Sequence, residues 1–256
     1  MGVVNVTPDS FSDGGRYLDT EAAVAHGMQL LRDGADILDV GGEATNPRAQ
    51  PVSADDELAR VLPVIERLAA AGARVSIDTT KAVVARAAVA AGATIVNDVS
   101  GGLFDPAIGE AVGEATYIAG HLRGRTLAEV FAAETAPSWE EVAAELSDRL
   151  AALPASVSAR AWVDPGIGFG KGADPAGNLG LLAHAGDIAR AVGRPVCVGP
   201  SRKRFLRRLL GGQPTELELD AASMAACLAA ARAGANVLRA HNVTLLRAGL
   251  TVYTKM

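Results

Sequence analysis

The chain has 256 residues, of which 49 % are hydrophobic and 21 % are charged. This length and apolar content suit one large globular domain that covers residues 1–256. The formal net charge of −5 argues against nucleic acid as the main partner, because nucleic-acid-binding proteins usually carry basic surfaces. No apolar run approaches the roughly 18 residues that a membrane-spanning helix needs, which argues against a membrane protein.

The two cysteines, Cys197 and Cys227, lie in apolar stretches that lack the spacing of metal ligands. Cysteines in such surroundings behave as small buried hydrophobic residues. Neither needs an oxidising compartment, so the sequence predicts a protein of the reduced cytoplasm.

Short β-branched runs alternate along the chain with longer amphipathic runs rich in Ala and Leu. The first kind predicts strands and the second kind predicts helices. The expected strands are Gly2–Val6, Ile37–Gly41, Val75–Asp78, Thr94–Asp98, Thr116–His121, Ala161–Asp164, Pro195–Gly199 and Asn236–His241. The expected helices are 20–33, 53–71, 81–91, 105–113, 138–152, 178–192, 202–210 and 218–233, with a last one that begins near 243.

Eight expected strands, each followed by an expected helix, predict a parallel sheet. At this chain length, the count favours closure into a single (β/α)8 TIM barrel of the α/β class. The alternative is an open doubly wound sheet, which periodicity alone does not distinguish from a barrel. Because the first expected strand begins at Gly2, we expect either that a preceding segment is missing or that this barrel lacks an N-terminal cap.

In such a barrel, functional groups lie where the strands end and the following loops begin. Polar residues collect at the ends of all the expected strands. In chain order they are Asn5 with the loop 7–15, Glu43 with Thr45, Asp78, Asn97 with Asp98, His121 with Arg123, Asp164, Ser201 with Arg202 and Lys203, and Arg239 with His241. A single residue of this kind often only caps a helix or braces a turn. Polar groups at every strand end together predict a site.

The residue types indicate the ligands. Two aspartates and an asparagine can accept from and donate to the edge of a planar, nitrogen-rich ring. Asn5, Arg239 and His241 lie on the first and last strands, which are neighbours in a closed barrel, and they suit a phosphate. Ser201 precedes an expected helix with three basic residues, where a carboxylate could bind. One ring site flanked by two anion sites predicts a transfer between two substrates.

The segment Asp164–Lys171 is rich in glycine. It lacks the pattern of a Walker A loop, so we do not expect it to bind ATP. Its spaced glycines let the backbone approach a ligand closely, and Phe169 can offer an aromatic face.

With these residues in view, the chain closely resembles the dihydropteroate synthases over nearly its whole length. Residues 5–15, Asn-Val-Thr-Pro-Asp-Ser-Phe-Ser-Asp-Gly-Gly, are similar to the family's first signature, and Gly41-Gly42-Glu43 with Thr45 and Pro47 resembles most of the second. Later segments similar to the family are Ser76–Thr79, Asn97–Gly101, Asp164–Lys171, Ser201–Phe205 and Arg239–His241.

The resemblance implies a transferase of folate biosynthesis, with Mg2+ as its cofactor. Such an enzyme joins 6-hydroxymethyl-7,8-dihydropterin pyrophosphate to p-aminobenzoate by a dissociative displacement. The resemblance also implies a cytoplasmic homodimer that forms through late helices, and a target of sulfonamides. The loops after the first and second strands are expected to act as mobile lids.

The resemblance further implies roles for single residues. Asp78, Asn97, Asp164 and Lys203 would bind the pterin ring, and Asn5, Arg239 and His241 would bind the pyrophosphate, with Asn5 also on Mg2+. Thr45, Phe169, Ser201 and Arg202 would shape the p-aminobenzoate site. The implied catalytic set is Asp78, Asp164, Lys203, Arg239 and His241.

Several positions depart from the family pattern. The second signature has Ala44, Asn46 and Arg48 where Ser, Arg and Gly are usual. Asn46 lacks the charge and reach of an arginine, and Arg48 is a candidate substitute. Gly120 replaces a Met, which predicts a looser or reshaped pterin pocket, and Asn242 replaces an Asp. Weakened, altered or drug-tolerant activity would follow from these changes.

Three other functions fit parts of the sequence. A pterin-binding paralogue with little or no synthase activity would explain the second lid, but Asp78, Lys203 and Arg239 are all retained. A pterin-dependent methyltransferase domain would not need Ser201–Phe205. An aldolase could form a Schiff base through Lys203, because flanking arginines can lower the pKa of a lysine.

Overall fold

The computed structural model describes residues 1–7, 15–45, 50–172 and 174–255. Residues 8–14 and 46–49 therefore lie outside the described residues. These segments include most of the first expected lid and part of the second, so the expectations placed on Asn46, Pro47 and Arg48 concern residues that the structure does not describe.

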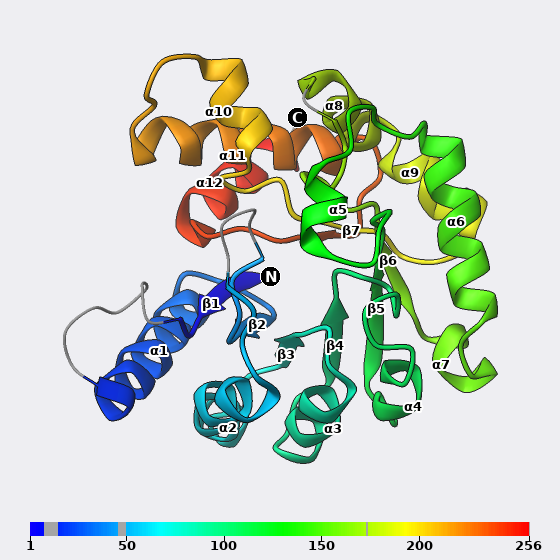
Figure 1. The fold of residues 1–256 in the computed structure, drawn as a ribbon. Helices are drawn as coiled ribbons and strands as arrows, with labels where there is room; N and C mark the ends of the chain where they lie inside the picture. The colour runs from blue at the N-terminus through cyan, green and yellow to red at the C-terminus, as the bar shows by residue number, and fades with distance from the viewer. Residues whose placement is uncertain (8–14, 46–49, 173, 256) are drawn as a thin grey trace.

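Parallel strands form the centre of the molecule (Figure 1). They are β1 (Gly2–Asn5), β2 (Leu38–Gly41), β3 (Val75–Asp78), β4 (Ile95–Asp98), β5 (Thr116–Gly120), β6 (Trp162–Asp164), β7 (Cys197–Val198) and β8 (Val237–Leu238). Strands β1 to β6 pair in chain order, and β7 pairs with β8. Isolated bridges from Val163 to Val196 and from Gly2 to Ala240 join the two sheets into a closed wall. The predicted TIM barrel is confirmed, and the open doubly wound sheet is excluded.

Helices surround this wall. They are α1 (Gly15–Arg32), α2 (Ala54–Ala70), α3 (Ala82–Ala90), α4 (Ile108–Ala111), α5 (Leu127–Phe131), α6 (Trp139–Ala151), α7 (Ala155–Ala159), α8 (Pro175–Ala183), α9 (Ala185–Val192), α10 (Arg204–Leu210), α11 (Glu216–Arg232) and α12 (Val243–Tyr253). Helices α1 to α4 lie along the lower edge of Figure 1, and α10 to α12 lie along the upper edge. Within the described ranges, none of these helices is long and apolar enough to cross a membrane.

Helix α2 shows why these segments are helical. Its N-cap residue Ser53 accepts a hydrogen bond from the backbone N of Asp56, which satisfies one amide of the first turn. Further along, Val61, Ile65 and Leu68 recur at helical spacing and have no exposed surface. The amphipathic pattern that predicted the helix is therefore the face that packs on the barrel.

Some helices differ from expectation. The helix expected at 178–192 is divided into α8 and α9 at His184, whose ψ of 19° leaves helical geometry. The sequence analysis missed α5 and α7, because helices of five residues are too short to show a period. Helix α10 begins at Arg204 rather than at 202, since Arg202 has a φ of 57° in the left-handed region.

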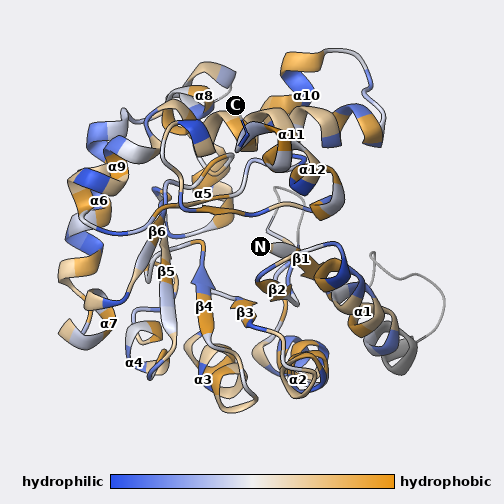
Figure 2. Ribbon diagram, turned by 180° about the vertical axis from the view of Figure 1, so that it is seen from behind, coloured by the Kyte–Doolittle hydropathy of each residue, from blue (hydrophilic) through white to orange (hydrophobic). Residues whose placement is uncertain are grey.

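Strands β1, β3, β4 and β6 each end in a polar residue at the carboxyl end. In β4, Ile95 and Val96 have no exposed surface, and they are followed by Asn97 and Asp98. Figure 2 shows this change as an orange strand with a blue arrowhead. Strands β7 and β8 are shorter than expected, but a bond from Arg239 N to Val198 O keeps the backbone in the wall beyond them. Polar side chains are thereby collected at one end of the barrel.

Candidate active site

A pocket of about 320 Å³ opens at the carboxyl ends of the strands. Most of the residues predicted for the site line it. They are Asn5, Thr45, Asp78, Phe169, Ser201, Arg202, Lys203, Arg239 and His241. These residues follow six different strands, so only closure of the barrel brings them together.

The register of the strands arranges polar groups at one level. The Cα partners across neighbouring strands are Asn5 with Gly41, Gly41 with Asp78, and Asp78 with Asn97. A Cβ at Gly41 would lie 3.4 Å from the Asp78 Cβ. A side chain at position 41 would therefore be in contact with the side chain of Asp78.

Arg239 binds two carboxylates of the barrel interior. Its Nε donates to Asp39 Oδ2 and its Nη2 donates to Asp78 Oδ2, each at 2.6 Å. Asn97 Nδ2 donates to the same Asp39 oxygen at 3.0 Å. Burial raises the pKa of Asp78 to about 7, although the Arg239 charge opposes that rise. Burial alone would lower the pKa of Arg239, but the charges of Asp39 and Asp78 outweigh it and raise that pKa.

Asp39 was missed by the sequence analysis. It has no exposed surface, and its Oδ1 has no hydrogen-bond partner among the described residues. A buried carboxylate oxygen without a partner is costly, and the bonds that Arg239 and Asn97 donate to the other oxygen offset part of that cost. Asp39 is not among the residues that line the pocket. An acidic residue in the middle of an otherwise apolar strand was the signal that could have revealed it.

Lys203 lines the pocket, whereas Asp164 and Asn97, which were also predicted for the site, are not among its lining residues. Asp164 Oδ1 accepts from the backbone N of Gly166 at 2.7 Å, and burial raises the pKa of this carboxyl. Lys203 Nζ lies 3.8 Å from the centroid of the Phe169 ring, within reach of a cation–π interaction. Burial lowers the pKa of Lys203 to about 8, and the charge of Arg239 lowers it further. The Lys203 ammonium thus interacts with an aromatic face and with nearby charges.

Ser201 and His241 hold each other at the end of the barrel. The backbone N of His241 donates to Ser201 Oγ at 3.2 Å, and the same hydroxyl lies 2.9 Å from His241 Nδ1. Burial lowers the pKa of His241 to about 3, with Arg239 acting in the same direction, so the imidazole is neutral at pH 7. If the hydroxyl donates to Nδ1, the other ring nitrogen, Nε2, is an N–H donor for a ligand.

Arg202 lines the pocket but differs from its expected role. The sequence predicted that it would begin a helix aimed at an anion, whereas α10 begins at Arg204. The Nε and Nη2 atoms of Arg202 donate to the two carboxylate oxygens of Asp220, at 2.7 and 3.0 Å. This pairing follows from the left-handed backbone at Arg202, and it uses two of the donors that were expected to meet a ligand.

Two ion pairs fix the loop that carries Thr45. Lys81 Nζ donates to Glu43 and also to Glu57 Oε2, the latter at 2.6 Å. Glu43 Oε1 in turn accepts from the backbone N of Val52 at 3.1 Å. The chain on both sides of residues 46–49 is thereby tied to α2 and to the start of α3.

The short helix α5 adds an aromatic side chain that the sequence analysis missed. Phe131 lines the pocket, and its ring centroid lies 5.9 Å from that of Phe169, with the planes inclined by 38°. Val130 packs beneath them with Leu122. The pocket therefore has an aromatic side as well as a charged side, and Lys203 lies where the two meet.

Two expectations about the end of β5 are corrected. His121 was expected at the polar rim, but it has no exposed surface and contacts Glu145 and Lys171 instead of the pocket lining. Gly120 was expected to loosen the pterin pocket. A Cβ there would lie 2.4 Å from the carbonyl oxygen of Val99, so backbone already fills that space.

The described residues contain no group of three or more His, Cys, Asp and Glu side chains that could hold a metal ion. Asn5 is exposed at the pocket and offers one amide oxygen. A divalent cation at this position would need most of its ligands from a substrate or from water.

Comparisons with known proteins agree with this geometry. Residues 1–241 match a family described as pterin binding enzyme. The chain is 44 % identical to the dihydropteroate synthase of Mycobacterium leprae, over 95 % of this chain and 88 % of that protein. Dihydropteroate synthase of Xanthomonas albilineans with 4-aminobenzoic acid superposes with a TM-score of 0.89 at 43 % identity, over 100 % of this chain and 91 % of that one. The Xanthomonas albilineans structure with 7,8-dihydropteroate gives 0.85 at 42 % identity, over 100 % and 92 %.

Proposed function

The chain belongs to the dihydropteroate synthases, a family of pterin-binding enzymes, and from this premise we propose how its pocket is divided between two substrates. The reaction joins 6-hydroxymethyl-7,8-dihydropterin pyrophosphate to p-aminobenzoate and gives 7,8-dihydropteroate and pyrophosphate. One observation supports this division of the pocket between two substrates. Asp78 and Arg239, which form an ion pair, line the same pocket as the aromatic pair of Phe131 and Phe169.

The pterin ring is assigned to the charged side, against Asp78, Asn97, Asp164 and Lys203. Carboxylates accept from the N–H groups of such a ring, whereas Lys203 and Asn97 can donate to its oxygen and nitrogen atoms. Asp39 supports this set from outside the pocket lining, because its Oδ2 accepts from Arg239 and Asn97. Burial disfavours charged carboxylates, and a ring that donates to them offsets that cost.

The pyrophosphate is assigned to Asn5, Arg239 and His241. The Nε and Nη2 atoms of Arg239 donate to carboxylates, but its Nη1 has no hydrogen-bond partner among the described residues. Neutral His241 can donate through Nε2, and Asn5 can donate through its amide nitrogen. Charged and neutral donors together suit a leaving group that gains negative charge as its bond breaks.

The p-aminobenzoate is assigned to Thr45, Phe169, Ser201 and Arg202. Phe169 offers its ring face, and Ser201 offers a hydroxyl near the expected carboxylate. Arg202 contributes less than the sequence implied, because Asp220 occupies two of its donors. Phe131 joins this aromatic side as a further wall.

The displacement proceeds without a covalent bond to the protein. The bond between the pterin methylene carbon and the pyrophosphate oxygen breaks first, and the arylamine nitrogen then attacks the cation that remains. The carboxylates of Asp78 and Asp164 stabilise positive charge on the pterin, while Arg239 and His241 stabilise negative charge on the leaving group. The arylamine loses one proton as the carbon–nitrogen bond forms.

Mg2+ is the proposed cofactor. This cation commonly keeps several waters and binds through one or two protein oxygens and substrate phosphates. The chemistry of the pocket fits such binding, since Asn5 supplies one oxygen beside the site assigned to pyrophosphate. When bound, Mg2+ would supply positive charge next to the leaving group.

The remaining expectations concern the whole molecule. We propose that residues 1–256 act as one domain, since a single barrel runs from β1 to β8. The two cysteines are free and buried, which supports the reduced cytoplasm as its compartment. Homodimer formation through late helices is supported by exposed apolar side chains on α10, α11 and α12, which are Leu209, Leu210, Leu217 and Val252.

Product formation tests the proposed function. Purified protein would be incubated with both substrates and Mg2+ while dihydropteroate and pyrophosphate are measured. We expect product that requires both substrates and Mg2+ and that Asp78→Asn removes. Pterin binding without product would instead support a paralogue that keeps the ring site and lacks the transfer chemistry.

A further inference from the structure

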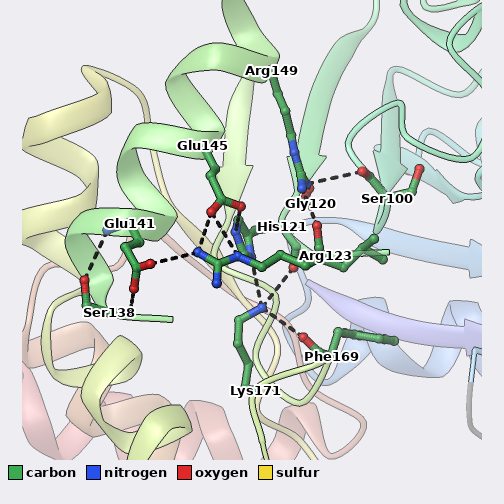
Figure 3. Close-up of polar contacts among 11 residues, drawn as sticks. Ser100, Gly120, His121, Arg123, Ser138, Glu141, Glu145, Arg149, Phe169 and Lys171 are labelled. Atoms are coloured by element: carbon green, nitrogen blue, oxygen red, sulfur yellow. Dashed lines mark hydrogen bonds and ion pairs between the residues drawn. The ribbon is translucent and has the colours of Figure 1, made fainter. Parts of the chain in front are cut away.

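A buried lysine lies just outside the pocket, at the end of the glycine-rich loop that follows β6. Lys171 is 2 % exposed. Its Nζ contacts three acceptors, which are His121 Nδ1 at 3.0 Å, His121 O at 3.1 Å and Phe169 O at 2.9 Å (Figure 3). An ammonium group has three protons to donate, so these contacts use all of them within the protein.

The three acceptors around Nζ favour the ammonium form of Lys171, beside a neutral His121. Burial lowers the pKa of His121 to about 3. Its Nε2 lies 2.9 Å from Glu145 Oε2 and therefore carries the proton, which leaves Nδ1 to accept from Lys171. Burial also lowers the pKa of Lys171 to about 7, while the charge of Asp164 acts against that fall. Glu145 is in turn held by Arg123 Nε at 2.9 Å.

Lys171 closes the loop 164–171 around His121, the residue that follows β5. At the start of the loop, the carbonyl oxygen of Asp164 accepts from the backbone N of His121 at 2.9 Å. At its end, Lys171 donates to the carbonyl oxygen of the same histidine. Gly166 has a φ of 73°, and a Cβ there would lie 1.8 Å from that oxygen, so only glycine permits this approach. Both ends of the loop are thus bound to His121.

The closed loop carries the aromatic wall of the pocket. Phe169 is 8 % exposed, lines the pocket and packs its ring against Lys203 Nζ and Phe131. Lys171 holds the carbonyl group of this same residue. The bond therefore fixes the backbone from which the Phe169 ring projects.

We propose that Lys171 is a positioning residue for the p-aminobenzoate subsite, which acts by holding the Phe169 backbone and through it the Phe169 ring. This inference rests on the division of the pocket given above. Lys171 does not contact the cluster of Asp78 and Arg239, which belongs to β3 and to the segment after β8. Loss of its ammonium should therefore affect the arylamine more than the pterin.

The test replaces Lys171 with methionine, which keeps an unbranched side chain and removes the three donors. For Lys171→Met, we expect the KM for p-aminobenzoate to rise about tenfold, as the loss of a charge-assisted hydrogen bond predicts. The KM for the pterin pyrophosphate should change less than about twofold. An equal rise in both values, or none in either while the variant is folded, would overturn the proposal.

Arg160→Met is the matched control. Arg160 also binds three backbone carbonyls, those of Ala115, Ser156 and Gly113, but these lie away from the pocket. Its loss should lower the melting temperature and leave both KM values unchanged. A shift in the ratio of the two KM values for Lys171→Met alone would separate positioning from general destabilisation.

A double-mutant cycle with Phe169→Leu tests whether Lys171 acts through Phe169. In that background, Lys171→Met should add little to the KM for p-aminobenzoate, because residues that act as a unit are not additive. Fully additive effects would contradict the proposal.

Should Lys171→Met fail to fold, Glu145→Ala provides a second variant, since the Glu145 side chain is 34 % exposed. It frees His121 to place its proton on Nδ1, against Lys171, and should raise the same KM by a smaller factor. An unchanged KM would count against the proposal. Failure of the wild-type protein to form dihydropteroate would instead contradict the proposed function.

Discussion

Two clusters of buried charged residues lie near the carboxyl ends of the strands, and they differ in what their polar atoms face. In the first, Arg239 joins Asp39 and Asp78, lines the pocket, and keeps an Nη1 that has no hydrogen-bond partner among the described residues. In the second, Lys171 uses all three of its protons on His121 and Phe169. The first cluster keeps polar atoms that can bind a ligand, whereas the polar atoms of the second cluster hold a loop in place.

This difference shows how a site can be recognised among buried charges. Each cluster contains a residue at or just after a strand end with a shifted pKa, Asp78 in one and His121 in the other, so burial and electrostatics alone do not separate them. The distinguishing feature is position, because Asp78 and Arg239 line the pocket whereas Lys171 and His121 do not. We therefore assign substrate binding to the cluster of Asp78 and a supporting role to the cluster of Lys171.

The largest effect is expected from Asp78→Asn compared with Asp98→Asn. Asp78 should be essential, because an amide cannot carry the charge that stabilises the pterin cation, and kcat/KM should fall roughly 100- to 1000-fold. Asp98 ends the neighbouring strand but binds Tyr117 OH and the backbone N of Gly102, both at 2.7 Å. Steady-state kinetics and chemical denaturation would measure both variants.

Asp98→Asn should lower the free energy of unfolding by about 1–3 kcal/mol while the folded enzyme keeps its KM values. Similar losses of kcat/KM in the two variants would contradict the assignment of Asp78 to substrate binding and of Asp98 to a structural role.

The pH dependence of kcat/KM for the pterin substrate should be the next largest effect. Asp78 has a pKa raised to about 7, so it loses its charge as the pH falls through that value. Lys203 has a pKa lowered to about 8, so it loses its charge as the pH rises through that value. A narrow bell is expected, with slopes of about tenfold per pH unit outside it.

Lys203→Met should lower the plateau of this profile and remove its alkaline limb. A wild-type profile that stays flat across both pKa values would show that these charges do not govern pterin binding.

A smaller effect is expected from Phe131→Ala on the aromatic side. Its ring packs against Phe169, and aromatic pairs of this kind are worth about 0.5–1.5 kcal/mol, so the KM for p-aminobenzoate should rise roughly two- to tenfold. Phe104→Ala is the control, because Phe104 packs in the same apolar cluster but is not among the lining residues of the pocket. An equal rise in both variants would indicate loss of packing rather than of a contact with substrate.

The smallest effect is expected at the outer rim of the second cluster. The Arg123 side chain is 45 % exposed, and its bonds to Glu141 and Glu145 are solvated. Arg123→Ala should therefore change the free energy of unfolding by less than about 1 kcal/mol, as measured by urea denaturation. A loss above about 2 kcal/mol would mean that this rim supports the buried part of the cluster more strongly than exposure suggests.

Most of the fold and much of the site could be predicted from the sequence. The alternation of short β-branched runs with amphipathic runs marks each strand and most helices, and the number of units favours a barrel. Strand-end residues such as Asn5, Asp78 and Arg239 are recognisable because the barrel collects all strand ends at one side.

The features of the site that could not be predicted from the sequence depend on contacts between residues far apart in the chain. Asp39 and Arg239 are 200 residues apart in sequence, so their ion pair leaves no local pattern. The left-handed backbone of Arg202 and the short helix that carries Phe131 are likewise set by packing. His121 shows the converse, since its position at a strand end resembles that of Asp78 although its side chain is turned toward Lys171.

A crystal structure of this protein with 7,8-dihydropteroate would test the account most directly, because one ligand occupies both halves of the pocket. We predict that the pterin half contacts Asp78, Asn97 and Asp164, and that the benzoate half lies beside Phe169 with Lys171 still bound to the Phe169 carbonyl. A pterin ring bound away from Asp78 and Asn97, or a benzoate that does not touch Phe169, would contradict the proposed division of the site.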